Sequence, residues 1–149
     1  MKFLEVNNLD IEYQTRKETI YASKNVSFNL QRGEIIGIVG ESGSGKSTVA
    51  NAIINLIDKP GIITNGSIKL DGGELHNDTD IIKNIRGKKI GFIFQDPQTS
   101  LNPLFKIRDQ LIETIQTHSD LNFKEAESKS INLLREVGIE NPEKRINDY

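Results

Sequence analysis

The sequence contains no cysteine, so these residues form no disulfide, no thiol nucleophile and no cysteine-based zinc or iron–sulfur site. This composition fits a reducing compartment such as the cytosol. The chain also lacks a large excess of either charge, because 19 basic and 21 acidic residues are mixed along it and give a net charge of −2. Nothing here predicts binding to nucleic acid or lipid by electrostatics. No stretch approaches the roughly 18 apolar residues of a membrane span, and the N-terminus does not read as a secretion signal.

The first part of the chain predicts strands and helices in an α/β arrangement, within the single domain that 149 residues allow. Apolar residues at every second position indicate strands from Phe3 to Tyr13 and from Tyr21 to Leu30, joined by a polar turn. The continuous apolar run at 35–39 indicates a strand buried on both faces. Beyond a glycine-rich loop, the expected elements are a helix at 49–57, a strand at 66–70, a short helix at 81–85 and a strand at 89–94.

The last third of the chain has a helical character. Residues 107–117 and 123–137 carry apolar side chains at the spacing of amphipathic helices. Asn122 and Glu125 stand three apart, which is the spacing of a reciprocal cap at a helix start. Gly138 follows the final apolar residue, where a left-handed C-terminal cap is expected.

Residues 40–48 carry the clearest chemical motif. They read GESGSGKST and match G-x-x-x-x-G-K-[ST] between a predicted strand and a predicted helix. Glycine at positions 43 and 45 lets the backbone fold around a phosphate with its N–H groups pointing inward. The alternative is a flexible turn. We predict that ATP phosphates are held by Gly40, Glu41, Ser42, Gly43, Ser44, Gly45, Lys46, Ser47 and Thr48.

Three side chains of this loop have separate expected roles. The helix that begins near Lys46 presents its positive end to an anion, and the Lys46 ammonium adds a full charge that is expected to reach the β- and γ-phosphates. The Ser47 hydroxyl is placed to coordinate the Mg²⁺ that bridges them, and Thr48 adds a phosphate contact. The cofactors expected are therefore ATP and Mg²⁺.

A second motif begins where the apolar segment 90–94 ends on Gln95 and enters a loop with two prolines. This arrangement resembles the Q-loop of ABC ATPases. The resemblance implies that Gln95 touches Mg²⁺ and the attacking water, and that the loop from Gln95 to Pro103 contacts transmembrane permease subunits. An amide can offer an oxygen to a metal and a donor to water without carrying charge. The alternative is an ordinary strand end.

The resemblance extends to one family within the ABC ATPases. GIVGESGSGKS at 37–47, IRGKKI at 85–90, FQDP at 94–97 and SLNP at 100–103 look like the dipeptide/oligopeptide/nickel importer ATPases, and the likeness covers nearly the whole chain. It implies an α/β P-loop NTPase fold of the ABC type, as a partial nucleotide-binding domain. Its expected parts are an antiparallel β part at 1–33, a phosphate-loop core with an incomplete parallel sheet at 34–95, and the start of a helical subdomain at 96–149.

Two tyrosines and two histidines complete the candidate residues. Tyr13 lies where ABC ATPases place an aromatic side chain against the adenine ring, and its alternative is a core tyrosine on a strand face. Tyr21 is a weaker candidate because it begins the next predicted strand. His76 and His118 each stand alone in polar surroundings, so we interpret both as surface residues without a catalytic role.

The chain also departs from the family pattern. No apolar strand ending in Asp-Glu follows Gln95, no LSGG-type signature is present, and neither histidine follows such a strand. In the family these elements supply a magnesium contact, the general base and the surface that closes over ATP in a head-to-tail dimer. Lys46 and Gln95 therefore remain the catalytic candidates, and we expect these 149 residues to bind ATP better than they hydrolyse it.

Three functions remain open from the sequence. The favoured one is an ATPase subunit that powers import of peptides or a similar small solute from the cytoplasmic face of the membrane, together with permease subunits and a second ATPase subunit. The second is an ABC ATPase without a transport role. The third is a truncated or catalytically inactive nucleotide-binding module, which the missing carboxylate base keeps open.

Overall fold

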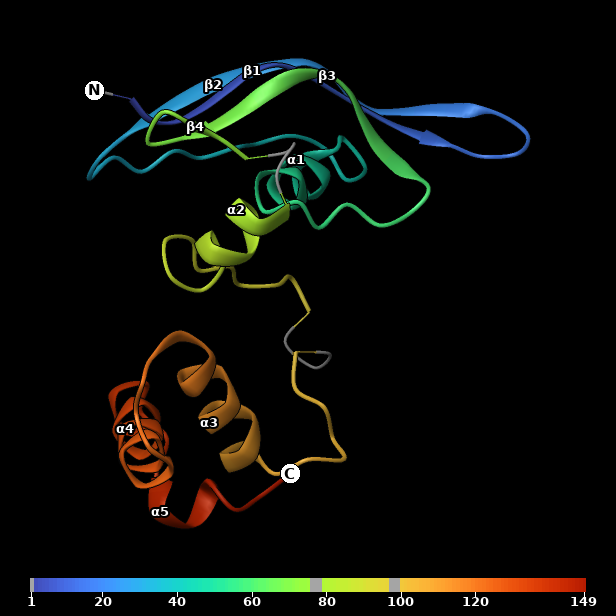
Figure 1. Ribbon diagram of the computed structural model, residues 1–149. Helices are drawn as coiled ribbons and strands as arrows, with labels where there is room; N and C mark the ends of the chain where they lie inside the picture. The colour runs from blue at the N-terminus through green and yellow to red at the C-terminus, as the bar shows by residue number, and fades with distance from the viewer. Residues whose placement is uncertain (1, 76–78, 97–99) are drawn as a thin grey trace. The chain divides into compact units, whose positions relative to one another are not determined.

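The computed structural model describes residues 2–75, 79–96 and 100–149, with the side chains of residues 79 and 80 left aside (Figure 1). The chain forms two compact units, Met1–Ile90 and Gly91–Tyr149. Each unit has its own internal packing and is described separately.

The first unit contains a four-stranded antiparallel sheet with the strand order β2-β1-β3-β4. The predicted pair of N-terminal strands is confirmed as a long hairpin, whose tip is held by Thr15. The Thr15 N–H donates to the Glu18 carbonyl at 3.0 Å, and the Thr15 hydroxyl accepts from the Glu18 N–H at 3.1 Å. The strands are β1 (Lys2–Gln14), β2 (Thr19–Gln31), β3 (Gly61–Leu70) and β4 (Gly73–Glu74).

Helices α1 (Lys46–Ile53) and α2 (Thr79–Ile85) lie on one face of this sheet (Figure 1). The helix expected at 49–57 begins three residues earlier, directly after the glycine loop. It ends earlier too, because Asn55 adopts a left-handed φ of 52° that a helix does not continue through. The core between sheet and helices contains Val6, Leu9, Ile11, Ile68, Leu70 and Leu75 with Val49 and Ala52 of α1 and Ile82 and Ile85 of α2.

A bulge in β1 explains why the apolar pattern of this strand is irregular. Val6 and Leu9 are three residues apart, yet both are fully buried. Strict alternation would place them on opposite faces. Asn8 between them has a left-handed φ of 48°, and the pairing with β2 shifts at this point, so the strand turns its apolar side back to the core.

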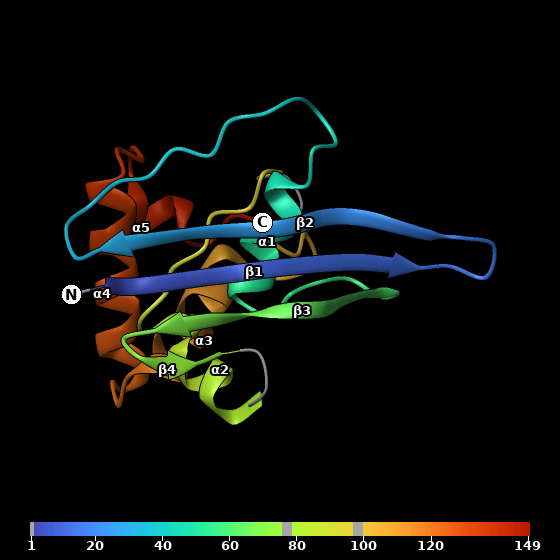
Figure 2. The same cartoon turned by 90° about the horizontal axis from the view of Figure 1, so that it is seen from above.

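Two predicted strands are wrong, and the described residues contain no parallel sheet of the kind expected at 34–95. Residues 35–39 form no strand, and Ile35 and Val39 are 97% and 93% exposed. Residues 89–94 form no strand either, and their only bridge among the described residues joins Arg86 to Ile90. A buried strand needs neighbouring strands for its N–H and C=O groups, and no described strand pairs with either segment. Figure 2 shows the segment between β2 and α1 as an irregular chain beside β2.

The second unit consists of α3 (Ile107–His118), α4 (Phe123–Glu136) and the short α5 (Pro142–Arg145). Both long helices are confirmed, as is the cap of α4. The Asn122 side chain accepts from the Glu125 N–H at 3.1 Å, and the Glu125 carboxylate accepts from the Asn122 N–H at 2.9 Å. Gly138 has a φ of 81°, the left-handed conformation expected after α4.

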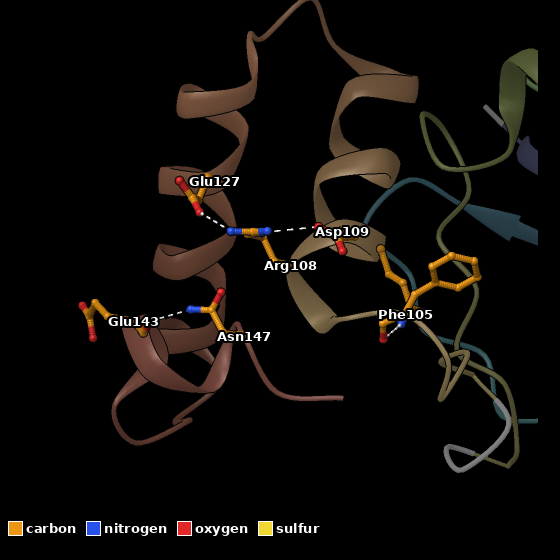
Figure 3. A network of polar contacts seen from close by, with 7 residues as sticks. Phe105, Arg108, Asp109, Glu127, Glu143 and Asn147 are labelled. Carbon is orange, nitrogen blue, oxygen red and sulfur yellow. Dashed lines mark hydrogen bonds and ion pairs between the residues drawn. The ribbon is translucent and has the colours of Figure 1, made fainter.

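Polar contacts link α3 to α4 (Figure 3) and to the C-terminal tail. The Arg108 guanidinium lies between Asp109 Oδ1 at 3.3 Å and Glu127 Oε1 of α4 at 3.8 Å. The N–H groups of Ile107 and Arg108 donate to carbonyls of the C-terminal tail, at Asp148 and Ile146 respectively. No helix in the described parts of either unit is both long enough and apolar enough to span a bilayer.

Candidate phosphate-binding site

The glycine loop before α1 is shaped by two residues in the left-handed region. Gly43 has a φ of 80° and Gly45 a φ of 86°, which other residues adopt only with strain. Gly45 also approaches β2 closely, because a Cβ built on it would lie 2.0 Å from the Ala22 carbonyl oxygen. The loop therefore depends on glycine at position 45 both for its conformation and for its contact with the sheet.

Lys46 is the first residue of α1, and its side chain folds back over the loop. Its Nζ donates to the carbonyl oxygens of Gly40 at 2.8 Å and Glu41 at 2.6 Å, and to the Ser44 hydroxyl at 3.2 Å. A full positive charge is thus held among the backbone groups of the loop. Ser44 closes the loop further, since its N–H donates to the Glu41 carbonyl at 3.2 Å.

The N-terminus of α1 is suited to an anion. Its N-cap, Gly45, has no side chain to cap the helix, and no acidic residue lies in the first turn. The first backbone N–H groups of a helix lack intrahelical partners and carry the positive end of its dipole. The exposed Ser47 hydroxyl makes no hydrogen bond within the described part of the chain, and Thr48 beside it is half-buried. These groups are positioned to bind phosphate and a cation that accompanies it.

A cavity of about 310 Å³ brings the predicted adenine-contacting residue to this loop. It is lined by Tyr13, Ile20, Tyr21 and Ala22 on the strand side and by residues 43–48 on the other. Tyr13 packs so closely against β3 that a Cβ on Gly61 would lie 2.9 Å from its ring. Tyr21 is 59% exposed, and the Lys24 ammonium lies 5.4 Å from its ring centroid. Both tyrosines therefore border the same cavity, and the more buried Tyr13 is the better fixed.

A second cavity, of about 700 Å³, shares Ala22, Gly45 and Lys46 with the first. It is bordered by β2, by residues 36–40 and by Lys46 and Val49 of α1. Sequence reasoning missed the contribution of β2 here, namely the Ala22 carbonyl and the buried Ser23, whose hydroxyl has no partner in the described structure. No motif marks these two residues, and only the register of β2 beside the loop reveals them.

The remaining predicted residues lie elsewhere. Gln95 belongs to the second unit, and its side chain is exposed. The loop after it falls partly outside the described residues, since positions 97–99 are not covered, and so does His76. His118 is half-buried at the end of α3. Within residues 2–75, 79–96 and 100–149, no cluster of three or more His, Asp or Glu side chains could hold a metal ion.

The comparisons with known proteins agree on the family of this chain. The ABC transporter family profile matches residues 23–149. The chain belongs to the ABC transporter family. It is 42% identical to the oligopeptide transport ATP-binding protein OppD of Bacillus subtilis, over 99% of this chain and 42% of that protein. It is 37% identical to the dipeptide transport ATP-binding protein DppD of Haemophilus influenzae, over 100% of this chain and 46% of that protein.

Solved ABC cassettes show the same fold. The dimeric cassette MJ0796, in a post-hydrolysis state with bound ADP and Pi, is 30% identical and superposes with a TM-score of 0.82. The match covers 97% of this chain and 60% of that one. The predicted α/β P-loop NTPase fold of the ABC type is thereby confirmed, as is the resemblance to peptide-importer ATPases. The chain spans less than half the length of the curated relatives it matches.

Proposed function

We propose that this chain binds ATP with Mg²⁺ through residues 40–48 and is the nucleotide-binding part of an ATPase subunit that drives import of peptides or a similar small solute. The observation that carries the proposal is the loop itself. Lys46 and the uncapped N-terminus of α1 place positive charge around a backbone that is free of side chains at positions 43 and 45. The likeness to peptide-transport ATP-binding proteins supports the solute class.

Each residue of the loop has a proposed role. The backbone N–H groups of Gly40, Glu41, Ser42, Gly43, Ser44 and Gly45 surround the phosphates, Lys46 binds the β- and γ-phosphates, and Thr48 adds a further contact. Ser47 holds Mg²⁺, which when bound neutralises charge on the transferring phosphate. Tyr13 stacks on adenine, a contact supported by its place in the cavity that residues 43–48 also line.

Hydrolysis is proposed for the full-length protein. Lys46 stabilises charge on the phosphate, and Gln95 orients the attacking water and contacts Mg²⁺. Neither residue is a carboxylate that could act as general base. The competing function is a nucleotide-binding module without turnover. It is favoured because neither Lys46 nor Gln95 can act as that base. ATP turnover by the full-length protein together with its partner subunit distinguishes the two.

Permease subunits are proposed to bind at the loop from Gln95 to Pro103, on the cytoplasmic face of the membrane. Support comes from apolar side chains that follow Gln95. Leu101, Leu104 and Phe105 are 46%, 80% and 56% exposed. They stand on a fixed backbone, because the Gln110 amide donates to the carbonyls of Asn102 and Phe105, both at 3.0 Å. A rigid apolar surface of this kind suits a protein partner. A second ATPase subunit, identical or related, completes the proposed assembly.

The division of the chain into an antiparallel part at 1–33, a phosphate-loop core at 34–95 and a helical start at 96–149 is part of the same proposal. The antiparallel sheet also takes β3 and β4 from the second of these parts.

Lys46→Ala in the full-length protein tests the binding site. Calorimetric titration with Mg²⁺ and ATP is expected to show an affinity about 10- to 100-fold weaker, because the change removes a charge-assisted contact worth about 1.5–3 kcal/mol. Lys124→Ala, which removes an exposed lysine of α4, is the control and leaves the affinity unchanged. Equal affinities for wild type and Lys46→Ala would refute the assigned site.

A further inference from the structure

Arg86 directly follows α2, and its half-buried guanidinium reaches the C-terminal end of α1. Its Nε donates to the Ile54 carbonyl at 2.7 Å, and its Nη2 donates to the Asn55 carbonyl at 2.6 Å. Two successive carbonyls just beyond the last turn of the phosphate-loop helix, those of the C-cap Ile54 and of Asn55, are therefore bound by one planar cation.

This end of α1 needs such a partner. The carbonyls at and just beyond the end of a helix have no intrahelical donors, and they lie at the negative end of the helix dipole. No basic residue lies in the last turn of α1 itself. Arg86 supplies the missing charge, and the fixed geometry of a guanidinium sets the direction of both hydrogen bonds.

The backbone of Arg86 is itself held in place. The Ile85 carbonyl accepts from the N–H groups of Lys88, Lys89 and Ile90 at 3.2, 2.8 and 3.1 Å, in a turn where Gly87 has a φ of 75°. Ile85 is 7% exposed and belongs to the same core as Val49 and Ala52 of α1. The cation and the helix end that it binds are thus fixed to one apolar core.

We propose that Arg86 is a positioning residue for the phosphate loop, holding α1 by its far end so that Gly45 and Lys46 face the phosphates in a fixed direction. The helix has 8 residues and is about 12 Å long at a rise of about 1.5 Å per residue, so a tilt at one end displaces the other. Phosphate binding is sensitive to such displacement because backbone N–H groups have to point at the anion. This inference rests on the proposed ATP binding.

The test is calorimetric titration of the full-length protein with Mg²⁺ and ATP. Arg86→Met keeps most of the apolar stem and removes the guanidinium, and its dissociation constant is expected to rise about tenfold, at an unchanged number of sites per molecule. Arg86→Lys retains the charge but offers a point donor instead of a planar fork, and a rise of about threefold is expected.

Arg32→Met is the matched control. Arg32 is an exposed arginine of the same unit, paired with Asp71 at 3.0 Å and stacked 4.4 Å from the Phe3 ring centroid, and its replacement leaves the dissociation constant unchanged.

The dissociation constant and the number of sites per molecule together separate a positioning role of Arg86 from a purely structural one. Loss of folded protein alone would lower the number of sites while the remaining molecules bind ATP normally, and that result would overturn the proposal. If Arg86→Met does not fold, Arg86→Lys decides: a raised dissociation constant supports positioning, and a wild-type value overturns it. If the wild type binds no ATP, the proposed function fails and this inference falls with it.

Discussion

Gly45 illustrates how a single residue joins the phosphate loop to the sheet. Both Gly43 and Gly45 have a left-handed φ. Only at Gly45 would an added Cβ meet the Ala22 carbonyl of β2. The G-x-x-x-x-G-K-[ST] pattern predicted that glycine is needed at both positions. It could not show that a Cβ on Gly43 would meet no other atom while one on Gly45 would meet a neighbouring strand, because that contact depends on the register of β2.

The two glycines give a paired prediction on stability. Gly45→Ala combines backbone strain with the clash at Ala22, and it is expected to lower the free energy of unfolding by more than about 3 kcal/mol. Gly43→Ala meets no atom within 4 Å, so only strain remains and the expected loss is about 1 kcal/mol. Urea denaturation of the full-length protein without nucleotide measures both. Equal losses for the two variants would show that the approach to β2 does not matter.

At the scale of elements, sequence reasoning succeeded where a segment's partners are near in the chain. In the β1–β2 hairpin and in helices α3 and α4, the backbone hydrogen bonds join residues that are near one another in the sequence. The α4 cap needs only Asn122 and Glu125. The strands expected at 35–39 and 89–94 failed for the opposite reason. Their apolar character predicts burial, but a strand also requires an adjacent strand, and periodicity within one segment does not reveal whether that neighbour is present.

The junction of α4 and α5 predicts a pH dependence. The pKa of Glu143 lies below its ordinary value, chiefly because the backbone N–H of Glu143 itself bonds the carboxylate, and also because Arg135 of α4 donates to it and lies close by as a cation. A lowered pKa in the folded state means that the carboxylate stabilises the fold above the unfolded pKa, near 4.5 for this group, and that this contribution is lost as the pH falls below it.

NMR titration of the Glu143 carboxyl carbon measures this directly. In Arg135→Met the pKa is expected to move part of the way back toward 4.5, because the backbone hydrogen bond remains. The effect on stability is small, since both side chains are exposed and water screens the pair. A wild-type pKa at or above 4.5 would contradict the assigned contacts.

At the scale of the whole molecule, the 149 residues leave apolar surface uncovered in both units. Ile35 and Val39 are almost fully exposed in the first unit, and Ile93 is 97% exposed in the second. Exposed apolar segments with unpaired backbone groups promote association between chains.

We expect the 149-residue polypeptide to self-associate as its concentration rises, and Ile35→Lys to reduce this association. Sedimentation velocity over a range of concentrations measures the effect. Val137→Lys is the control, because Val137 is 73% exposed at the end of α4 and lies outside these unpaired segments. A monomeric wild-type polypeptide at all concentrations would contradict the expectation.

The three hydrogen bonds of the Lys46 ammonium have a consequence for ligand choice. Any anion that enters the loop competes with the Gly40 and Glu41 carbonyls and the Ser44 hydroxyl for the same three donors. The three groups that an anion displaces are neutral, and a triphosphate brings more oxygens and more negative charge to one ammonium and one helix end than a single orthophosphate does. We therefore expect the loop to bind a triphosphate more tightly than free orthophosphate.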